Sequence, residues 1–300
     1  MIQKVGIVGR GAIGALYGTL LMEHGCKDLV FIVDEDRKKR YETDPVTING
    51  KDIPFSYVTK GDPLDLILIC TKYAGLNAAI EEIKDFMSPH TILLSCLNGI
   101  ESETILRQHF SKDQVIRCIV QGMDSTYLNN TVDFSHVGQI LFGAENENQK
   151  ALVDALEVFF EQYRIPYRRC ENIYRDQWNK LMLNCGINQV CAAHQTGYGG
   201  CQNGGAYQKE FIMAMKEVQK VARAKGIDLK DQDIEAWIDL VNSLRPEGMP
   251  SMAQDVQAKR KTELALFSGT IVPLAKKEGI EVPVLEKLMK EIQRIEQSFA

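Results

Sequence analysis

Three polar residues spaced one helical turn apart, Lys180, Asn184 and Asn188, are the residues of this chain best suited to chemistry. At about 100° per residue, positions four apart on a helix project in nearly the same direction, so the three side chains form one narrow polar ridge. Most of their neighbours are apolar, including Trp178 and Leu181, so we expect the ridge to be shielded from open solvent. An ammonium and two carboxamides in such surroundings cost about 1–3 kcal/mol each unless they find partners. The spacing therefore predicts a surface that faces a polar ligand.

The chemistry that this polar ridge suits best is proton donation beside hydroxyl recognition. A reaction that develops negative charge on a carbonyl oxygen needs a proton and hydrogen-bond donors at that oxygen. Burial would lower the pKa of Lys180 toward the working pH, whereas a nearby carboxylate would oppose that shift. Carboxamides offer both a donor and an acceptor to a hydroxyl group without adding charge. The alternative for Lys180 is a helix lysine that only extends its ammonium group to solvent.

A glycine-rich turn, Gly9-Arg-Gly11-Ala-Ile-Gly14, follows an apolar run and opens a helical pattern. In such a turn the first glycine allows a tight bend, the second lets a pyrophosphate approach, and the third permits close packing of helix and strand. The free N–H groups at the helix start favour phosphate. We therefore expect residues 9–14, including Arg10, Ala12 and Ile13, to bind a dinucleotide. The alternative is a structural turn without a ligand.

Asp34 ends the second apolar run, twenty residues after Gly14. A carboxylate there accepts hydrogen bonds from the adenosine ribose and repels a 2′-phosphate, which favours NAD. Arg10 and Arg37 lie close in sequence and could supply opposing positive charge. The alternative is that residues 34–36 form a solvated turn.

Two more polar signals follow predicted strands. Lys72 comes after the run 66–70, and Asn98-Gly99 comes after the run 92–96. Ligands of open α/β sheets collect at the carboxyl ends of the strands, so we expect Lys72 and Asn98 at the same edge as the glycine-rich turn. Each taken alone is also compatible with an ordinary surface lysine and an ordinary turn.

The elements that must position these residues change character along the chain. In the first half, short apolar runs alternate with helical patterns, which predicts an α/β fold with a doubly wound parallel sheet. The predicted strands are 4–8, 29–33, 66–70, 92–96 and 115–120, with edge strands at 140–142 and 166–169, and the predicted helices are 13–22, 76–86 and 149–163.

The second half is predicted to be all helical. Its helical patterns cover 172–194, 205–224, 231–243, 252–260, 263–277 and 284–296, with a glycine-rich loop at 195–205. We place the boundary near residue 168, which gives a dinucleotide-binding domain at 1–168 and a helical substrate-binding and catalytic domain at 169–300.

Composition and charge indicate which binding partners and which cellular compartment to expect. A net charge of −5 over 300 residues offers no basic field for nucleic acid, and no apolar run approaches the roughly 18 residues of a membrane span. A strand pattern begins at Lys4, which leaves no room for a cleavable leader. The eight cysteines show neither CxxC nor Cys/His metal spacing. We expect a reduced, cytoplasmic protein without disulfides or a metal, and a homodimer is possible.

Taken together, these motifs resemble the ketopantoate reductase (2-dehydropantoate 2-reductase) family over nearly the whole chain. The motifs that carry the resemblance are Gly9-x-Gly11-Ala-x-Gly14, Thr71-Lys72-Tyr73, Asn98-Gly99, His136-Val-Gly138, the polar ridge, Lys216-Glu-Val and Ser251-Met-x-Gln-Asp255 leading into Thr262-Glu263. The resemblance implies an N-terminal Rossmann domain, a helical C-terminal domain and an active-site cleft between them. It further implies reduction of 2-dehydropantoate to (R)-pantoate by NADPH, on the route to pantothenate and coenzyme A.

The resemblance also implies a role for individual residues. Lys180 would be the general acid, Asn98 would lie beside both nicotinamide and substrate, and Asn184 and Asn188 would bind the hydroxyl end of the substrate. Ser251 would contact the substrate carboxylate, and Glu263 would reach the cofactor and help to orient the lysine. Local capping competes with both roles, because Ser251 with Gln254 fits a capping box and Glu263 fits a helix start.

Three departures from the family pattern keep other functions open. Asp34 replaces an arginine suited to a 2′-phosphate, Gln189 replaces a proline, and Tyr198 stands where some members place a substrate-binding asparagine. One alternative is an NADH-dependent D-2-hydroxyacid dehydrogenase that acts on branched 2-oxo acids. A second is a regulatory protein that senses the dinucleotide without turnover, which would have no use for the polar ridge.

Overall fold

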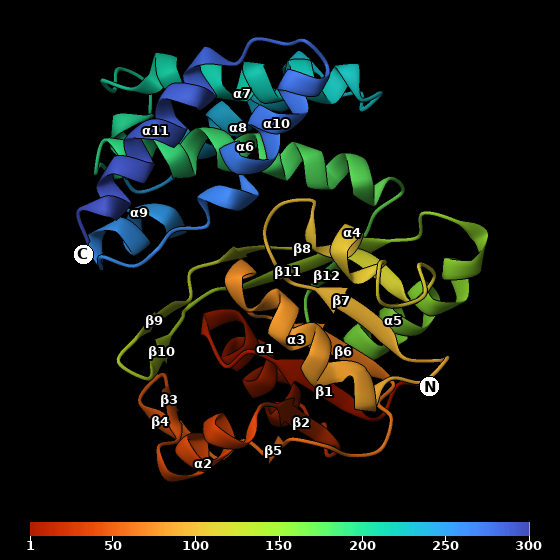
Figure 1. Cartoon of the computed structure of the whole chain (residues 1–300). Helices are drawn as coiled ribbons and strands as arrows, with labels where there is room; N and C mark the ends of the chain where they lie inside the picture. Colours follow the sequence, from red (N-terminus) through yellow and green to blue (C-terminus); the bar gives the residue numbers. More distant parts are fainter. Residues whose placement is uncertain (300) are drawn as a thin grey trace. The chain divides into compact units, whose positions relative to one another are not determined.

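The computed structural model describes residues 1–299, and the chain divides into two compact units. Unit 1 comprises Met1–Asn98 and Ser102–Tyr174, and unit 2 comprises Gly99–Glu101 and the chain from Arg175 onward. The sequence pattern put the boundary near residue 168. Figure 1 shows the strands in the first half of the chain and the long helices in the second.

Unit 1 is built on an eight-stranded sheet in the order β12-β11-β8-β7-β6-β1-β2-β5. The strands are β1 (Val5–Val8), β2 (Leu29–Ile32), β5 (Tyr57–Val58), β6 (Leu66–Ile69), β7 (Ile92–Ser95), β8 (Val115–Met123), β11 (Val137–Gly143) and β12 (Tyr167–Arg169). From β5 to β8 every pairing is parallel. This is the strand order of a Rossmann sheet, in which successive strands are added on one side from β1 to β5 and on the other side from β6 onward, so the order reverses between β1 and β6. The predicted doubly wound sheet is confirmed.

The prediction that 140–142 forms an edge strand is wrong. Strand β11 pairs antiparallel with β8 and parallel with β12, so β12 forms the edge on that side. The apolar run understated the strand, because its first three residues are only half-buried. An antiparallel strand can have one face open to solvent, so half-buried residues can belong to it without forming a continuous apolar run.

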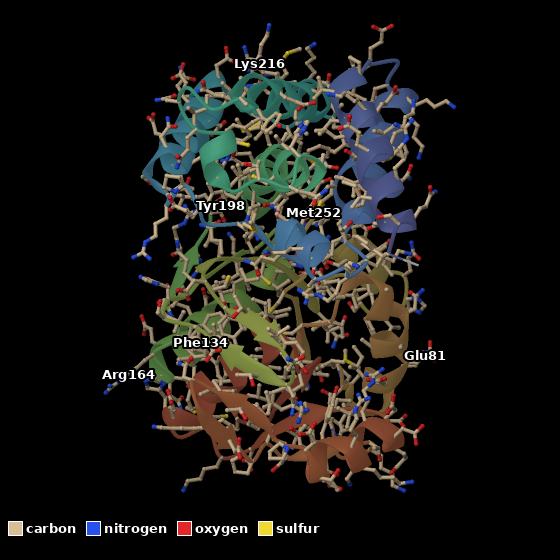
Figure 2. All side chains as sticks on the ribbon, turned by 90° about the vertical axis from the view of Figure 1, so that its left-hand side faces the viewer. Glu81, Phe134, Arg164, Tyr198, Lys216 and Met252 are labelled. Atoms are coloured by element: carbon tan, nitrogen blue, oxygen red, sulfur yellow. The ribbon has the colours of Figure 1, made fainter. Side chains whose placement is uncertain are left out.

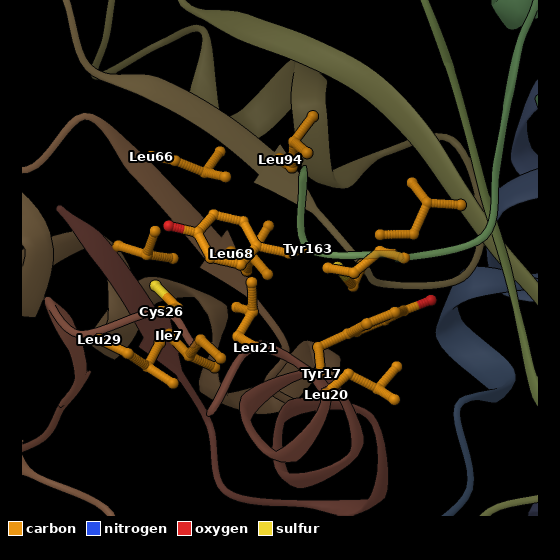
Figure 3. Packing of buried hydrophobic residues seen from close by; sticks show 14 of the residues in the cluster. Ile7, Tyr17, Leu20, Leu21, Cys26, Leu29, Leu66, Leu68, Leu94 and Tyr163 are labelled. Carbon is orange, nitrogen blue, oxygen red and sulfur yellow. The ribbon is translucent and has the colours of Figure 1, made fainter. Parts of the chain in front are cut away.

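Helices of unit 1 cover both faces of the sheet. They are α1 (Ala12–Glu23), α2 (Glu35–Thr43), α3 (Leu76–Ile83), α4 (Ser102–Leu106) and α5 (Lys150–Gln162). Because neighbouring strand residues point to opposite faces, Ile7 packs with residues of α1 and α5, whereas Val8 packs with α3 and Leu106 of α4. Figure 3 shows Tyr17, Leu20 and Leu21 of α1 in the first of these clusters.

A second, four-stranded sheet in the order β4-β3-β10-β9 was not predicted. Its strands are β3 (Val46–Ile48), β4 (Lys51–Ile53), β9 (Thr126–Leu128) and β10 (Thr131–Asp133), and each has only three residues. Both hairpins turn on two residues with positive φ, Asn49-Gly50 at 47° and 78° and Asn129-Asn130 at 48° and 60°. Asparagine and glycine adopt this conformation at low cost, so these dipeptides were a usable hairpin signal.

Unit 2 contains most of α6 (Ile173–Ala193) and the helices that follow it. These are α7 (Gln208–Ala224), α8 (Asp231–Ser243), α9 (Ser251–Gln257), α10 (Ser268–Lys277) and α11 (Pro283–Gln297), with short 3₁₀ segments at Tyr198–Gly200 and Leu264–Leu266. The predicted helix 263–277 is interrupted, because Phe267 has φ −111° and ψ −102°, outside the helical region. Within residues 1–299, no helix is long and apolar enough to cross a membrane.

Candidate functional site

The glycine-rich turn runs from the end of β1 into α1, at the point where the strand order reverses between β1 and β6. Gly9 has φ +98°, and a Cβ atom there would lie 2.7 Å from the carbonyl oxygen of Cys70. A Cβ atom on Gly14 would lie 1.9 Å from the carbonyl oxygen of Gly9. Both glycines are therefore required by the fold itself, the first for its conformation and for space and the second for space.

Gly11 differs from the other two glycines of the turn. A Cβ atom built on Gly11 would meet nothing within 4 Å, although Gly11 is the N-cap of α1 and provides no side-chain cap. The N–H groups of Ala12 and Ile13 in the first helical turn have no intrahelical partner, as at any helix start. Open space over a helix N-terminus fits a pyrophosphate, so these residues suit a dinucleotide.

The side chain of Arg10 turns into the protein instead of toward open space. It is 5% exposed, and its guanidinium carbon lies 3.6 Å from the centre of the Tyr41 ring. It donates hydrogen bonds to Tyr57 Oη at 2.9 Å and to Asn130 Oδ1 at 2.8 Å. Arg10 thus joins the turn to the small sheet, and no local sequence pattern indicates these distant partners.

Asp34 lies two residues beyond β2 and caps α2. Its Oδ1 accepts a hydrogen bond from the backbone N–H of Arg37 at 2.6 Å, and its Oδ2 pairs with Arg37 Nε at 3.1 Å. Arg37 also pairs with Glu82 at 3.3 Å. Residues 34–36 form the start of α2 instead of a turn, and Glu35 and Asp36 are exposed. Two carboxylates thus share one guanidinium beside the strand end.

Lys72 and Asn98 each follow the carboxyl end of a strand of the same sheet. Lys72 is exposed and precedes the 3₁₀ segment Tyr73–Gly75, whereas Asn98 is half-buried and follows β7 by three residues. Gly99 adopts φ +89°, and a Cβ atom there would lie 3.2 Å from the carbonyl oxygen of Leu266. The turn after Asn98 therefore needs glycine.

In unit 2, helix α6 carries the polar ridge. Asn184 and Asn188 are 7% and 6% exposed, and Lys180 is half-buried. Asn188 Nδ2 donates a hydrogen bond to Asn184 Oδ1 at 3.1 Å. The prediction that the ridge is shielded from open solvent is confirmed for both asparagines.

Ser251 meets the polar ridge through Asn188. Ser251 Oγ and the backbone N–H of Met252 both donate to Asn188 Oδ1 at 3.2 Å. The capping-box alternative for Ser251 is wrong, because Pro250 is the N-cap of α9 and Gln254 bonds to the carbonyl of Met249. Ser251 is the first residue of α9, and its hydroxyl group is directed to a residue 63 positions earlier.

Tyr198 belongs to the loop that follows α6. Its backbone N–H donates to the carbonyl of Gly248 at 2.8 Å, which ties this loop to the segment before α9. Burial, followed by the nearby Cys191, raises the pKa of Tyr198 to about 12. The phenol therefore stays protonated at neutral pH and can donate a hydrogen bond. Figure 2 labels Tyr198 in this loop and Met252 in α9.

Glu263 lies immediately before the 3₁₀ segment Leu264–Leu266 and makes no side-chain cap there. Glu263 thus stands at a helix start, as the alternative had it, but the helix is a short 3₁₀ segment and its carboxylate does not cap it. It is half-buried, and the hydroxyl group of its buried neighbour Thr262 bonds to Glu296 of α11 at 2.6 Å.

The predicted site residues fall into two sets, one in each unit. Unit 1 holds the glycine-rich turn, Asp34, Lys72 and Asn98. Unit 2 holds Lys180, Asn184, Asn188, Tyr198, Ser251 and Glu263.

Several solved structures share this fold over the whole chain. A PanE/ApbA family ketopantoate reductase from Ralstonia eutropha JMP134 aligns with a TM-score of 0.84, at 25% identity and 99% coverage of both chains. A D-mandelate dehydrogenase solved with NADH and anilino(oxo)acetate aligns with a TM-score of 0.87, at 22% identity and 99% coverage of both chains. At such low identity the second likeness concerns the fold alone.

Sequence comparison defines the family. A 2-dehydropantoate 2-reductase from Vibrio cholerae is 26% identical to this chain, with 99% of each protein covered. The family model described as "Ketopantoate reductase PanE/ApbA" matches residues 5–146, and "Ketopantoate reductase PanE/ApbA C terminal" matches residues 172–296. Because the two matches cover most of the chain, this protein belongs to the ketopantoate reductase family, whose members are NAD(P)-dependent oxidoreductases acting on a small keto acid.

Proposed function

We propose that this protein is a 2-dehydropantoate 2-reductase, which reduces 2-dehydropantoate to (R)-pantoate with a nicotinamide cofactor. The observation that carries the proposal is the buried polar ridge of α6, with Lys180 one turn before two hydrogen-bonded asparagines. A protein that only senses a dinucleotide has no evident use for a lysine and two buried carboxamides gathered on one face of a helix, because burial of polar groups costs free energy.

The proposal assigns the dinucleotide to residues of unit 1. The N–H groups at the start of α1, with the space over Gly11, would hold the pyrophosphate, and Asp34 would accept hydrogen bonds from the ribose. Lys72 and Asn98 would contact the cofactor from the ends of neighbouring strands, as the family resemblance implies. When bound, the reduced nicotinamide supplies the hydride.

The residues of unit 2 supply the proton and the recognition of the substrate. Lys180 would donate its proton to the oxygen on which negative charge develops, which lowers the barrier to reduction. Asn184 and Asn188 would read the hydroxyl end of the substrate. Ser251 would contact the carboxylate, since its hydroxyl can rotate from Asn188 to a stronger acceptor.

Glu263 and Tyr198 complete the proposed site. Glu263 would contact the cofactor and orient the Lys180 ammonium group. Tyr198 would donate a hydrogen bond to the substrate from its phenol, which a pKa of about 12 keeps protonated.

We further propose that the cofactor is NADH in preference to NADPH, against the NADPH that the family resemblance implies. Around Arg37, the carboxylates of Asp34 and Glu82 outnumber the guanidinium group by two to one. Arg10 of the glycine-rich turn is held by Tyr41, Tyr57 and Asn130. A 2′-phosphate beside Asp34 would therefore meet two carboxylates for one guanidinium group.

A second candidate is an NADH-dependent D-2-hydroxyacid dehydrogenase that acts on branched 2-oxo acids. Tyr198 favours it, because a phenol stands where some ketopantoate reductases place an asparagine. A D-mandelate dehydrogenase solved with NADH has the same fold, so the fold is compatible with this second candidate. Both candidates share the proposed roles of Lys180 and Asn184.

Steady-state turnover distinguishes these functions. The initial rates of reduction of 2-dehydropantoate and of 2-oxoisovalerate are measured with NADH and with NADPH. The leading proposal predicts the higher kcat/KM for 2-dehydropantoate with NADH. A higher kcat/KM for 2-oxoisovalerate supports the second candidate, and absence of turnover with every combination contradicts both.

A further inference from the structure

We infer that Glu82 of α3 is a specificity-determining residue, which keeps Arg37 of α2 from binding the 2′-phosphate of NADPH. The inference rests on the dinucleotide site of the proposed function and names the side chain that makes Arg37 unavailable to the cofactor. Asp34 is the residue that the Rossmann pattern marks for the choice between the two cofactors. Glu82 lies on a different helix, where no sequence motif marks it.

Arg37 stands where a cation could meet the adenosine end of a dinucleotide. It lies in the first turn of α2, the helix that follows β2, and Asp34 caps the same helix. Its side chain is 34% exposed, so the guanidinium group can be reached from solvent. Arginine suits phosphate well, because its planar fork offers two parallel N–H groups to two oxygens. A partly exposed arginine here would therefore favour NADPH unless other groups engage it.

Two carboxylates engage that guanidinium group on different edges. Asp34 Oδ2 lies 3.1 Å from Arg37 Nε, and Glu82 Oε1 lies 3.3 Å from Arg37 Nη1. A guanidinium group can bind phosphate with two nitrogens on the edge formed by Nε and Nη2, or on the end formed by Nη1 and Nη2. Each carboxylate therefore covers one nitrogen of one edge. With both in place, a phosphate finds no edge on which two nitrogens are open to it.

The burial of Glu82 is costly and is not explained by stability. Its side chain is 15% exposed, and its Oε2 is buried without a hydrogen-bond partner among residues 1–299. Burial raises the pKa of Glu82, and the positive charge of Arg37 opposes this effect. A buried carboxylate oxygen without a partner costs free energy. Glu82 therefore contributes less to stability than an apolar residue of its size would, which points to a role in holding the guanidinium group.

The two carboxylates differ in what their loss would change. Asp34 also accepts a hydrogen bond from the backbone N–H of Arg37 at 2.6 Å, so its loss would disturb the start of α2. Loss of Glu82 would leave that N-cap in place and open only the Nη1–Nη2 end of Arg37. With this end open, Arg37 can pair with two oxygens of a 2′-phosphate. Glu82 thus acts on the choice of cofactor through Arg37.

The experiment compares the binding of NADH and NADPH, which differ only in the 2′-phosphate. Dissociation constants are measured by fluorescence titration without substrate, for the wild type, Glu82→Met, Arg37→Ala and the double variant. Methionine keeps the length of the side chain and removes the carboxylate. We expect Glu82→Met to bind NADPH about tenfold more tightly than the wild type does, and NADH within about twofold. In the Arg37→Ala background, the same substitution should change NADPH binding by less than about twofold.

Glu81→Met is the matched control, because it removes an equal charge from the neighbouring position of α3. Glu81 is exposed, pairs with Lys84 at 2.6 Å and is labelled in Figure 2. Its loss should leave both dissociation constants within about twofold of the wild type. Glu82→Gln is a second variant, which keeps the shape of glutamate. Its neutral oxygen holds a guanidinium group less strongly than a carboxylate does, so we expect a smaller gain in NADPH binding.

An unchanged affinity of Glu82→Met for NADPH would overturn the inference. A gain that persists in the Arg37→Ala background would also overturn it, because direct repulsion by Glu82 would then explain the effect. An equal gain in Glu81→Met would show that any loss of negative charge suffices. A wild type that binds neither cofactor would contradict both the inference and the proposed function. If the titrations come out as expected but the wild type reduces neither 2-oxo acid, the proposed function fails and the role of Glu82 in cofactor choice stands.

Discussion

Arg10, in the glycine-rich turn, donates a hydrogen bond of 2.8 Å to Asn130, which lies 120 residues further along the chain. Asn130 occupies the turn between β9 and β10, and its own Nδ2 donates to the carbonyl of Pro45 at 2.9 Å. A segment proposed to bind the cofactor is therefore braced by a small sheet that contributes nothing to the Rossmann topology. The brace is specific to arginine, because its planar fork can stack on Tyr41 and donate to several acceptors at once.

Replacement of Arg10 by lysine should weaken this brace. Lysine keeps the charge but loses the stacking and the fork, so we expect the free energy of unfolding to fall by about 1–3 kcal/mol. The measurement is urea unfolding of the whole protein, monitored by circular dichroism. Arg40→Lys is the matched control, because Arg40 is exposed and lies 5.0 Å from the same Tyr41 ring. Equal effects of the two substitutions would show that burial of Arg10 adds nothing.

Gly11→Ala should separate folding from cofactor binding. A Cβ atom at Gly11 meets no protein atom within 4 Å, so the thermal unfolding temperature should stay close to that of the wild type. The same methyl group would occupy the space proposed for the pyrophosphate, so the dissociation constant for NADH should rise by about tenfold or more. Fluorescence titration measures this dissociation constant. Gly14→Ala provides the contrast, because its Cβ would clash with Gly9 and reduce stability. Unchanged NADH binding in Gly11→Ala would remove Gly11 from the site.

Asp34→Asn should shift the choice of cofactor. Asparagine keeps the N-cap of α2 but removes the charge that would repel a 2′-phosphate. We expect the ratio of kcat/KM with NADPH to that with NADH to rise by about tenfold, which corresponds to about 1.4 kcal/mol. Asp36→Asn is the control, since it removes an equal charge from the first turn of the same helix. A ratio that stays constant in Asp34→Asn, or that rises as much in Asp36→Asn, would contradict this role.

Glu145 should contribute stability that is lost in acid. Burial opposes ionisation, but hydrogen bonds from Arg107 and Arg117 lower the pKa of Glu145 below its usual value. The native state then binds fewer protons than the unfolded state, whose glutamate pKa is about 4.3. The stabilisation is complete above that value and disappears as the pH falls through the native pKa. The difference in unfolding free energy between wild type and Glu145→Gln should therefore shrink between about pH 5 and pH 3.

The control for this pH dependence is Glu147→Gln. Glu147 is 84% exposed and pairs with Lys150 on the surface, so its removal should change stability little at any pH. A difference for Glu145→Gln that stays constant across the range would show that the pair with Arg117 does not depend on ionisation.

The sequence predicted those parts of the fold that depend on local periodicity. The parallel strands and the helices α5 to α8 and α11 follow from continuous apolar runs and from apolar positions at helical spacing. The small sheet was missed because three-residue strands are too short to show a period, although Asn49-Gly50 marked one of its hairpins. Helix α2 was missed because no residue of it is buried, so no apolar stripe marks it.

The residues of the candidate site show the same distinction between what local sequence predicts and what it does not. Lys180, Asn184 and Asn188 could be found because one helix fixes their spacing, and Gly9 to Gly14 because one turn does. Contacts such as Ser251 with Asn188 or Arg10 with Asn130 join residues 63 and 120 positions apart. Nothing in local sequence encodes such a pairing, because it results from how helices and sheets pack. The capping interpretation of Ser251 failed for this reason, since a distant acceptor replaced the local one.

The most direct test of the proposed mechanism is the turnover of Lys180→Ala. If Lys180 donates the proton, kcat for reduction of 2-dehydropantoate should fall by about 100-fold or more, while the dissociation constant for NADH stays within about twofold of the wild type. Lys220→Ala, which removes an exposed lysine of α7, should leave both quantities unchanged. A Lys180→Ala enzyme that reduces 2-dehydropantoate at the rate of the wild type would contradict the account.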